Sequence, residues 1–230
     1  MKYYQNILNF YKQLIFDESI LPPKVKVMNP YFDSESGEIK EAIQAFYKKF
    51  YNDSNKRKII FGINPGRHGA GVTGIPFTDT KRLNSECGIS FSEFTTHETS
   101  SVFIYDMINA YGGTKKFYNE FYISAISPLG FVKSNDNKRE VNFNYYDDSK
   151  FKKKIKPFVI KCIEKQLDFG IETEKCFCLG NAANYNYLNE LNSEYKFFNE
   201  IIPLPHPRWV MQYRLKKKID FIKQYLETFK

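Results

Sequence analysis

The chain has 230 residues, 42% hydrophobic and 17% aromatic, which suits one sizeable packed α/β domain and excludes a disordered chain. No stretch approaches the roughly 18 consecutive apolar residues that a membrane-spanning helix needs. The 34 Lys and Arg against 26 Asp and Glu give a net charge of +8, which favours polyanionic partners such as DNA. An AT-rich genome would impose the same Lys-rich bias, so charge alone identifies no partner.

The first residues lack the basic, then apolar, then small pattern of a secretory signal, so we expect a cytoplasmic protein, nucleoid-associated if its partner is DNA. The four cysteines are Cys87, Cys162, Cys176 and Cys178. They form no paired C-x-x-C sets for zinc and no grouping suited to an iron–sulfur cluster. We therefore expect reduced, structural thiols and neither a metal nor a cofactor.

Hydrophobic spacing predicts helices and strands that alternate along the chain. The predicted helices cover residues 3–16, 39–51, 101–111, 148–170, a segment from 180, and 210–229. The predicted strands cover residues 58–63, 122–126, 176–179 and 201–202. Pro157 predicts a kink or restart in the fourth helix. The spacing in the last helix predicts that Leu215 and Ile219 are buried together with Ile222 and Leu226.

This alternation predicts an α/β fold of three layers, α/β/α, around a central four-stranded parallel sheet. We expect a single domain over residues 1–230, with 1–55 as a helical part that packs on the sheet. Ligands of such sheets bind beyond the carboxyl ends of the strands. Three strand exits have unusual sequences, at residues 64–66, 124–128 and 206–207, and we expect them to converge on one cleft.

The first exit, residues 62–77, contains five glycines and two prolines. Glycine lets backbone amides approach a ligand closely, and proline stiffens the loop. Residues 69–74 match the dinucleotide fingerprint G-x-G-x-x-G. However, these glycines begin several residues after the strand, and Ile-Pro-Phe follows them where a phosphate-binding helix should start. We therefore reject a nucleotide cofactor site.

Two motifs resemble those of a known enzyme family. Residues 62–66 (Gly-Ile-Asn-Pro-Gly) and 73–77 (Thr-Gly-Ile-Pro-Phe) resemble the first motif of uracil-DNA glycosylases of the mismatch-specific and single-strand-selective monofunctional (SMUG) types. Residues 205–207 (Pro-His-Pro) resemble the start of their second motif. The resemblance extends from residue 58 to the last helix and is greatest to a second, bacterial branch of SMUG-like enzymes.

The resemblance implies a role for each motif residue. Asn64 matches the residue that positions the attacking water. His206 matches the residue that hydrogen-bonds the carbonyl oxygen on which negative charge develops, an oxyanion-hole role. Phe77 matches the residue that stacks on the flipped base. The alternatives are a core phenylalanine and a structural histidine. The expected substrate-binding residues are Gly62, Ile63, Gly66, Phe77 and Ser124.

Ser124 marks a departure from the family. SMUG-type enzymes have an asparagine at this exit, which reads the pyrimidine edge with a donor and an acceptor. A single hydroxyl discriminates less sharply than a bidentate amide. We therefore expect a substrate range that includes xanthine and hydroxymethyluracil beside uracil.

The second motif continues as Arg-Trp-Val-Met-Gln-Tyr-Arg over residues 208–214, in place of the usual Ser-Pro. In the family this loop inserts a side chain into the duplex, and both apolar and guanidinium groups can unstack a base step. Trp209 has the alternative of anchoring the last helix, and the lysines that follow have the alternative of a solvated helix face. The expected DNA-contacting residues are Arg67, Arg208, Trp209, Met211, Arg214 and Lys217.

These observations predict a monomeric, monofunctional DNA glycosylase that hydrolyses the N-glycosidic bond in base excision repair. Its expected partner is single- or double-stranded DNA, not a membrane. No lysine or amino-terminal proline occupies a motif position from which a Schiff base forms. Two alternatives stay open. One is a non-catalytic DNA-binding module with the same fold, and the other is a small-molecule enzyme that binds a phosphate with the glycine loop.

Overall fold

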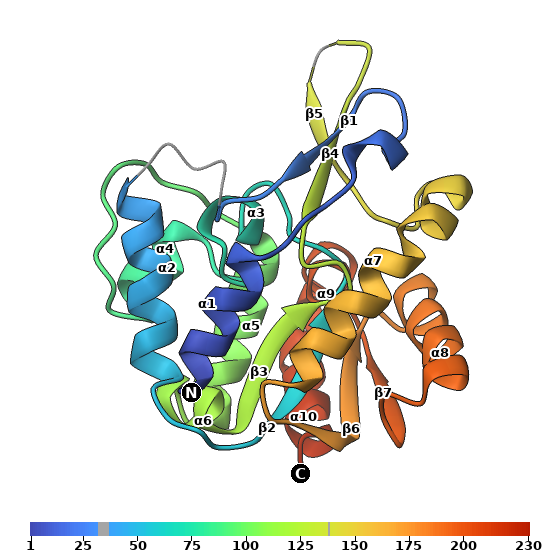
Figure 1. Cartoon of the computed structure of the whole chain (residues 1–230). Coiled ribbons are helices and arrows are strands. Elements are labelled where there is room, and N and C mark those ends of the chain that lie inside the picture. The colour runs from blue at the N-terminus through green and yellow to red at the C-terminus, as the bar shows by residue number, and fades with distance from the viewer. Residues whose placement is uncertain (32–36, 138) are drawn as a thin grey trace.

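The computed structural model describes residues 1–31, 37–137 and 139–230. At its centre lies a parallel sheet with the strand order β3-β2-β6-β7 (Figure 1). Its strands are β2 (Arg57–Gly62), β3 (Phe121–Ala125), β6 (Ile171–Leu179) and β7 (Glu200–Leu204). The two strands β2 and β3 are almost wholly buried, as expected for a parallel sheet covered on both faces. The predicted four-stranded parallel sheet is confirmed.

Helices cover both faces of this sheet, which confirms the three-layer order. The longer helices are α1 (Tyr3–Lys12), α2 (Gly37–Phe50), α5 (Thr99–Tyr111), α6 (Thr114–Glu120), α7 (Ser149–Leu167), α8 (Ala183–Tyr195), α9 (Pro207–Tyr213) and α10 (Lys218–Thr228). On one face Tyr3 of α1 packs against Tyr122. On the other face Phe117 of α6 and Phe229 at the end of α10 pack against Phe121. Two short helices, α3 (Ala70–Thr73) and α4 (Thr80–Ser85), lie in the chain that follows β2.

A second, antiparallel sheet lies above the carboxyl ends of the parallel strands (Figure 1). It consists of β1 (Val25–Met28), β4 (Gly130–Ser134) and β5 (Glu140–Phe143), in the order β1-β4-β5. No sequence pattern predicted this second sheet. Its strands are short, and β1 pairs with a strand more than a hundred positions away along the chain, Val25 opposite Lys133. This sheet brings residues 142–145 to the exit of β2.

The amino-terminal helix is tied to the sheet through Arg57, a fully buried residue at the start of β2. Its Nη1 and Nη2 atoms donate to the two carboxylate oxygens of Asp53 at 2.8 and 2.7 Å. Its guanidinium also lies over the rings of Tyr3 and Tyr51. A bidentate, stacked arginine satisfies its charge without water, so the junction of α1, α2 and β2 is rigid.

The prediction of one last helix over residues 210–229 is wrong. The backbone leaves helical geometry at Arg214 (φ −136°, ψ 26°), and a 3₁₀ turn, Leu215–Lys217, separates α9 from α10. Leu215 and Ile219 are 56% and 59% exposed, so the prediction that they are buried is also wrong. Apolar residues can recur at helical spacing on both sides of a turn, so the spacing did not predict the break between α9 and α10. Pro157 lies inside α7 without ending it.

Candidate functional site

The three unusual strand exits converge at the carboxyl end of the parallel sheet, where two adjoining cavities lie. The inner pocket is lined by residues that include Asn64, Phe77 and Ser124. The outer cleft is lined by residues that include Asn64, Phe77 and His206. Asn64 and Phe77 line both cavities, so the two lie next to one another. The convergence expected from the sequence is present.

Asn64 is held by backbone groups at and just after the end of β5 and by the neighbouring Pro65. Its Nδ2 donates to the carbonyl oxygens of Phe143 at 3.2 Å and Pro65 at 3.4 Å. Its Oδ1 accepts from the backbone N–H of Tyr145 at 3.3 Å. Both amide hydrogens are therefore used, and one lone pair of Oδ1 is left for another donor. An amide fixed in this way can orient a water molecule but cannot remove its proton.

Phe77 forms a wall shared by both cavities. Its backbone has a positive φ of 52°, which is unusual outside glycine and turns the ring toward β2. A methyl group added at Gly62 would lie 3.0 and 3.1 Å from the Cε2 and Cζ atoms of this ring. A side chain at position 62 would therefore push the Phe77 ring from its place by a few tenths of an ångström. The ring also lies 5.9 Å from the imidazole of His206, centroid to centroid.

His206 is the N-cap of α9, and its Nδ1 accepts a hydrogen bond from the backbone N–H of Arg208 at 3.1 Å. Burial and the nearby Arg208 guanidinium lower the pKa of His206 to about 4. The imidazole is therefore neutral at physiological pH, with its hydrogen on Nε2. This tautomer presents one N–H donor in the cleft, which suits the hydrogen-bonding role expected from the sequence.

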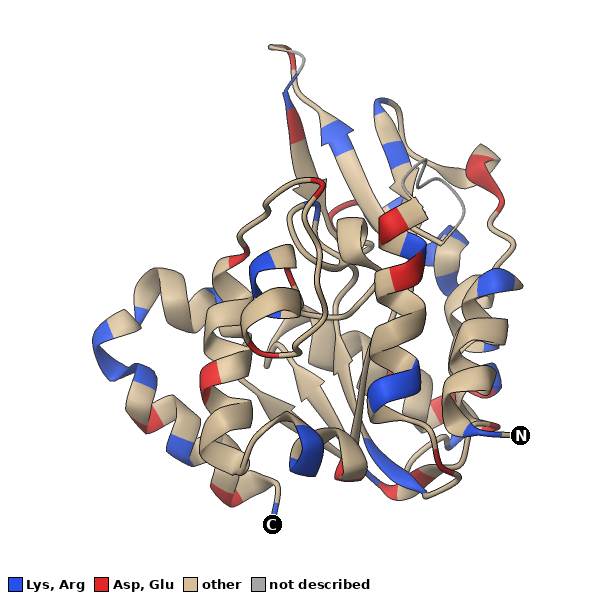
Figure 2. Cartoon of the chain, turned by 90° about the vertical axis from the view of Figure 1, so that its left-hand side faces the viewer, with Lys and Arg blue, Asp and Glu red and all other residues tan. Residues whose placement is uncertain are grey.

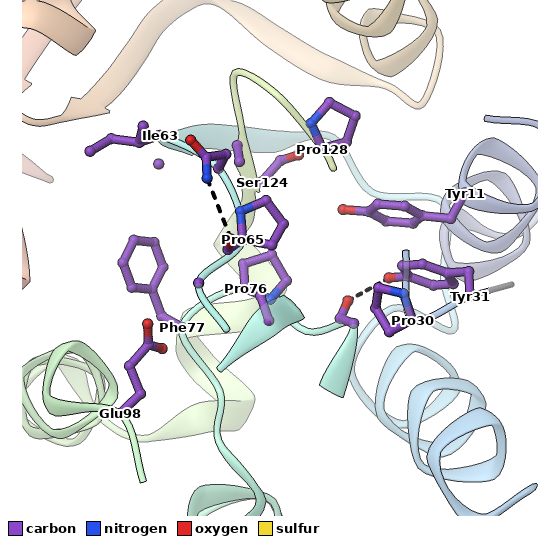
Figure 3. Close-up of a pocket in the computed structure, with 16 residues that line it drawn as sticks. Tyr11, Pro30, Tyr31, Ile63, Pro65, Pro76, Phe77, Glu98, Ser124 and Pro128 are labelled. Atoms are coloured by element: carbon purple, nitrogen blue, oxygen red, sulfur yellow. Dashed lines mark hydrogen bonds between the residues drawn. The ribbon is translucent and has the colours of Figure 1, made fainter. Parts of the chain in front are cut away.

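Ser124 lines the inner pocket, but its hydroxyl points toward α7. The Oγ atom donates to Oε1 of Gln166 at 2.5 Å and is completely buried. Figure 3 shows Phe77 and Glu98 together on one side of the inner pocket and the stacked rings of Tyr11 and Tyr31 on the other. The predicted role of Ser124 at the base edge stays a prediction.

The six residues expected to contact DNA occupy different places. Arg208 and Trp209 are exposed and line the outer cleft. Arg214 lies over the Trp209 ring at 5.1 Å, and Lys217 is exposed in the turn between α9 and α10, where Figure 2 shows a run of basic positions. Met211, by contrast, packs against the hydrophobic core.

Arg67 is half-buried, and its backbone N–H donates to Oδ1 of Asn142 at 2.9 Å. Neither Arg67, Met211, Arg214 nor Lys217 lines either of the two cavities. The structure therefore brings only two of the six, both from α9, directly to the cleft.

Glu98, which no sequence pattern predicted, also lines both cavities. It is the N-cap residue of α5, yet its side chain makes no cap hydrogen bond. Burial and the carboxylate of Asp79 raise its pKa to about 7, against an opposing effect of Arg208. Asp79 itself caps α4 by accepting from the backbone N–H of Arg82 at 2.9 Å.

Over residues 1–31, 37–137 and 139–230, no group of three or more His, Cys, Asp or Glu side chains is placed to hold a metal ion. No helix in the same ranges is long and apolar enough to cross a membrane. The four cysteines are free and buried, and burial raises the pKa of each thiol.

A protein-family profile matches the part of the chain that forms the cleft. The profile of the Uracil DNA glycosylase superfamily matches residues 48–230, which is most of the chain. The chain belongs to the uracil-DNA glycosylase superfamily. It is a DNA glycosylase of base excision repair, and the predicted resemblance is confirmed.

A solved structure agrees with this assignment. The crystal structure of wild-type SMUG2 from Pedobacter heparinus is similar to this glycosylase with a TM-score of 0.96 and 47% sequence identity. The match covers 100% of this chain and 97% of that one. No curated protein sequence matches the chain. The similarity to SMUG2 includes the first 47 residues, which the superfamily profile does not match.

Proposed function

We propose that this glycosylase flips a damaged nucleotide out of the DNA stack, binds its base against Phe77, and hydrolyses the N-glycosidic bond without cleaving the strand. The observation that carries the proposal is the meeting of Asn64, Phe77 and His206 in one cleft. They come from strand exits far apart in the sequence. An aromatic face, a fixed amide and a neutral imidazole donor are the groups that this reaction uses.

Each group has a defined part in the hydrolysis. As the bond between C1′ and the base nitrogen lengthens, its electron pair moves onto the base, and negative charge develops on a carbonyl oxygen. The Nε2–H of His206 donates to that oxygen, and because the imidazole is neutral no proton has to be transferred for the charge to be stabilised. The Oδ1 of Asn64 orients the water that adds to C1′, which leaves an abasic site.

The monofunctional course is supported by the residues of the two cavities. A glycosylase that also cleaves the strand needs an amine that forms a Schiff base with the sugar. Over the part of the chain that the structure describes, no lysine lines the inner pocket or the outer cleft. We therefore expect the abasic site to be released intact.

The substrate range is inferred from the walls of the inner pocket. The Ser124 hydroxyl donates its one hydrogen to Gln166, which leaves it only acceptor capacity toward a base edge. A pocket without a bidentate amide at this position discriminates less sharply among carbonyl-bearing bases. We propose that uracil, hydroxymethyluracil and xanthine are all released.

We propose that the protein binds DNA as a monomer and that the DNA lies across the outer cleft. Trp209 and Arg208, at the amino-terminal end of α9, are placed to fill the space that the flipped nucleotide leaves. Lys217 and its neighbours in the next turn are placed to contact phosphates.

A base-release assay on labelled oligonucleotides tests the proposal. Each oligonucleotide carries one uracil, hydroxymethyluracil, xanthine or hypoxanthine, in single and double strands. We expect release of several of these bases and strand cleavage only after alkali. Binding of DNA without release of any of the four bases would instead indicate the non-catalytic module.

A further inference from the structure

Glu98 is the one feature of the cleft that neither the motifs nor the proposed roles use. As the N-cap residue of α5 it stands where a side chain usually accepts from the first helical N–H groups, yet it makes no such bond. Its backbone N–H instead donates to Oδ2 of Asp79 at 2.7 Å, which fixes the position of the residue. The side chain thus extends away from its own helix and into the wall shared by both cavities.

The glycine loop lies directly on the Glu98 carboxyl. A methyl group added at Gly69 would be 2.1 Å from Oε2, and one added at Gly66 would be 3.0 Å from Oε1. The Oε2 atom is fully buried and has no hydrogen-bond partner among the described residues. A carboxyl group buried in this way is costly, and such a cost is typical of a functional group that acts once substrate arrives. Figure 3 shows this carboxyl beside Phe77 at the inner pocket.

The attacking water that Asn64 is proposed to orient needs a second hydrogen-bond acceptor, which a carboxyl group beside Asn64 can provide. Asn64 uses both amide hydrogens and one acceptor position in hydrogen bonds to the backbone. It is therefore left able to accept a single hydrogen bond from a water molecule. The water's second hydrogen needs another acceptor. Within the cavities that Asn64 lines, Glu98 is the side chain able to take up a proton as well as a hydrogen bond.

We propose that Glu98 is a catalytic residue that accepts the proton of the attacking water, an inference that rests on the proposed glycosylase function. The water oxygen bonds to C1′ as the bond from C1′ to the base nitrogen breaks, with its electron pair leaving on the base. The water proton passes to the Glu98 carboxylate, which becomes a carboxylic acid. The departing base anion takes its proton from solvent, and Glu98 later returns its own to solvent.

Charged groups around Glu98 suit this task. Asp79, at the start of α4, raises the pKa of the carboxyl, and Arg208 of α9 lowers it. The charge of Asp79 is partly offset by the Arg82 guanidinium at 3.4 Å, and Nδ1 of His97 lies 3.7 Å from Oδ2 of Asp79. A pKa of about 7 is close to the operating pH, where a group can both accept and return a proton.

The glycine loop that covers the carboxyl carries two further charged or titratable groups, Arg67 and His68. Burial and the charges of Arg67 and Arg208 lower the pKa of His68. Across the cleft, the pKa of His206 is about 4. His206 therefore does not titrate near neutrality, and a limb in that range that is lost in Glu98→Gln reports on Glu98.

The test compares single-turnover base release by the wild type and Glu98→Gln, on a uracil-containing oligonucleotide from about pH 5 to about pH 9. We expect the wild-type rate to rise with pH and to level off above about pH 7, because the Glu98 carboxyl must be ionised to accept a proton. Glu98→Gln should be slower by about 100-fold or more on the plateau and should lack this limb. Its DNA affinity should be equal or higher, because a negative charge has left the cleft.

Two further variants separate chemistry from folding. Glu98→Asp keeps a carboxylate and should retain the limb at a reduced rate, which a merely structural role does not predict. Glu227→Gln, which removes an equal charge from an exposed position on α10, should leave the rate and its pH profile unchanged. If Glu98→Gln releases uracil at a rate within about threefold of wild type, or keeps the pH-dependent limb, the proposed role of Glu98 is overturned but the proposed glycosylase function is not. A wild type that releases no base would overturn both proposals.

Discussion

The replacement of Glu98 by glutamine should stabilise the protein while it impairs catalysis. The carboxyl is buried against the glycine loop, its Oε2 has no partner, and burial with Asp79 raises its pKa from 4.5 to about 7. A carboxyl whose pKa is raised on folding costs nothing while it is protonated in both states. The cost begins to appear above pH 4.5, grows as the pH rises toward 7, and is complete above 7.

The magnitude follows from the size of the pKa change. The difference between 4.5 and 7 is 2.5 units, or about 3 kcal/mol at 1.36 kcal/mol per unit. The glutamine amide also lacks partners at this site, so we expect a gain of about 1–3 kcal/mol in the free energy of unfolding at alkaline pH. At about 2–4 °C per kcal/mol for a chain of this length, the Tm should rise by roughly 2–12 °C.

The assay is thermal unfolding of wild type and Glu98→Gln at a series of pH values between about 5 and about 8. The Tm difference should be largest at the alkaline end and should shrink toward zero as the pH approaches 4.5, the ordinary value for a glutamate. A variant that is less stable than wild type at alkaline pH would refute the reasoning. So would a difference that does not depend on pH, because it would show that the carboxyl is not desolvated in the folded state.

The remaining predictions concern the motif residues and the DNA-facing turn. Asn64→Ala and His206→Ala should each lower kcat by about 100-fold or more, with DNA affinity by anisotropy within a few-fold of wild type; a parallel loss of affinity would contradict their assignment to chemistry. Gly62→Ala places a methyl group 3.0 Å from the Phe77 ring and should lower kcat/KM by about tenfold, less when combined with Phe77→Ala; additive losses would show that the two are uncoupled. Lys217→Gln should reduce the salt dependence of log Kd by about one unit of slope, whereas an unchanged slope would show that Lys217 contacts no phosphate.

Local sequence patterns predicted the strands of the parallel sheet but not the second sheet or the break in the last helix. The runs that became β2 and β3 are apolar and end in proline-containing turns, so periodicity and turn signals agreed. The sheet of β1, β4 and β5 was missed because β5 is short and largely exposed, and because β1 pairs with β4, a segment that is distant in the sequence. The break at Arg214 was missed because hydrophobic spacing does not report a change in backbone direction.

The candidate site divides in the same way. Asn64, Phe77 and His206 lie in motifs at strand exits, so their meeting followed from the topology of a parallel sheet. Glu98 follows a long connection without periodicity, and only the folded chain shows that the glycine loop covers it. One local signal was available. A glutamate at position 98, with Thr96 before it and Thr99 after it, occupies the N-cap of α5, where Ser, Thr, Asp or Asn is preferred.

The most direct test of the central claim is the treatment of a uracil-containing oligonucleotide with wild type and with Asn64→Ala, in the presence of EDTA. The strand is analysed with and without alkali. The account predicts that wild type produces alkali-labile sites at the uracil and no breaks without alkali, and that Asn64→Ala produces almost none. Equal release by both proteins, or breaks that do not require alkali, would contradict a monofunctional hydrolysis in which Asn64 orients the water.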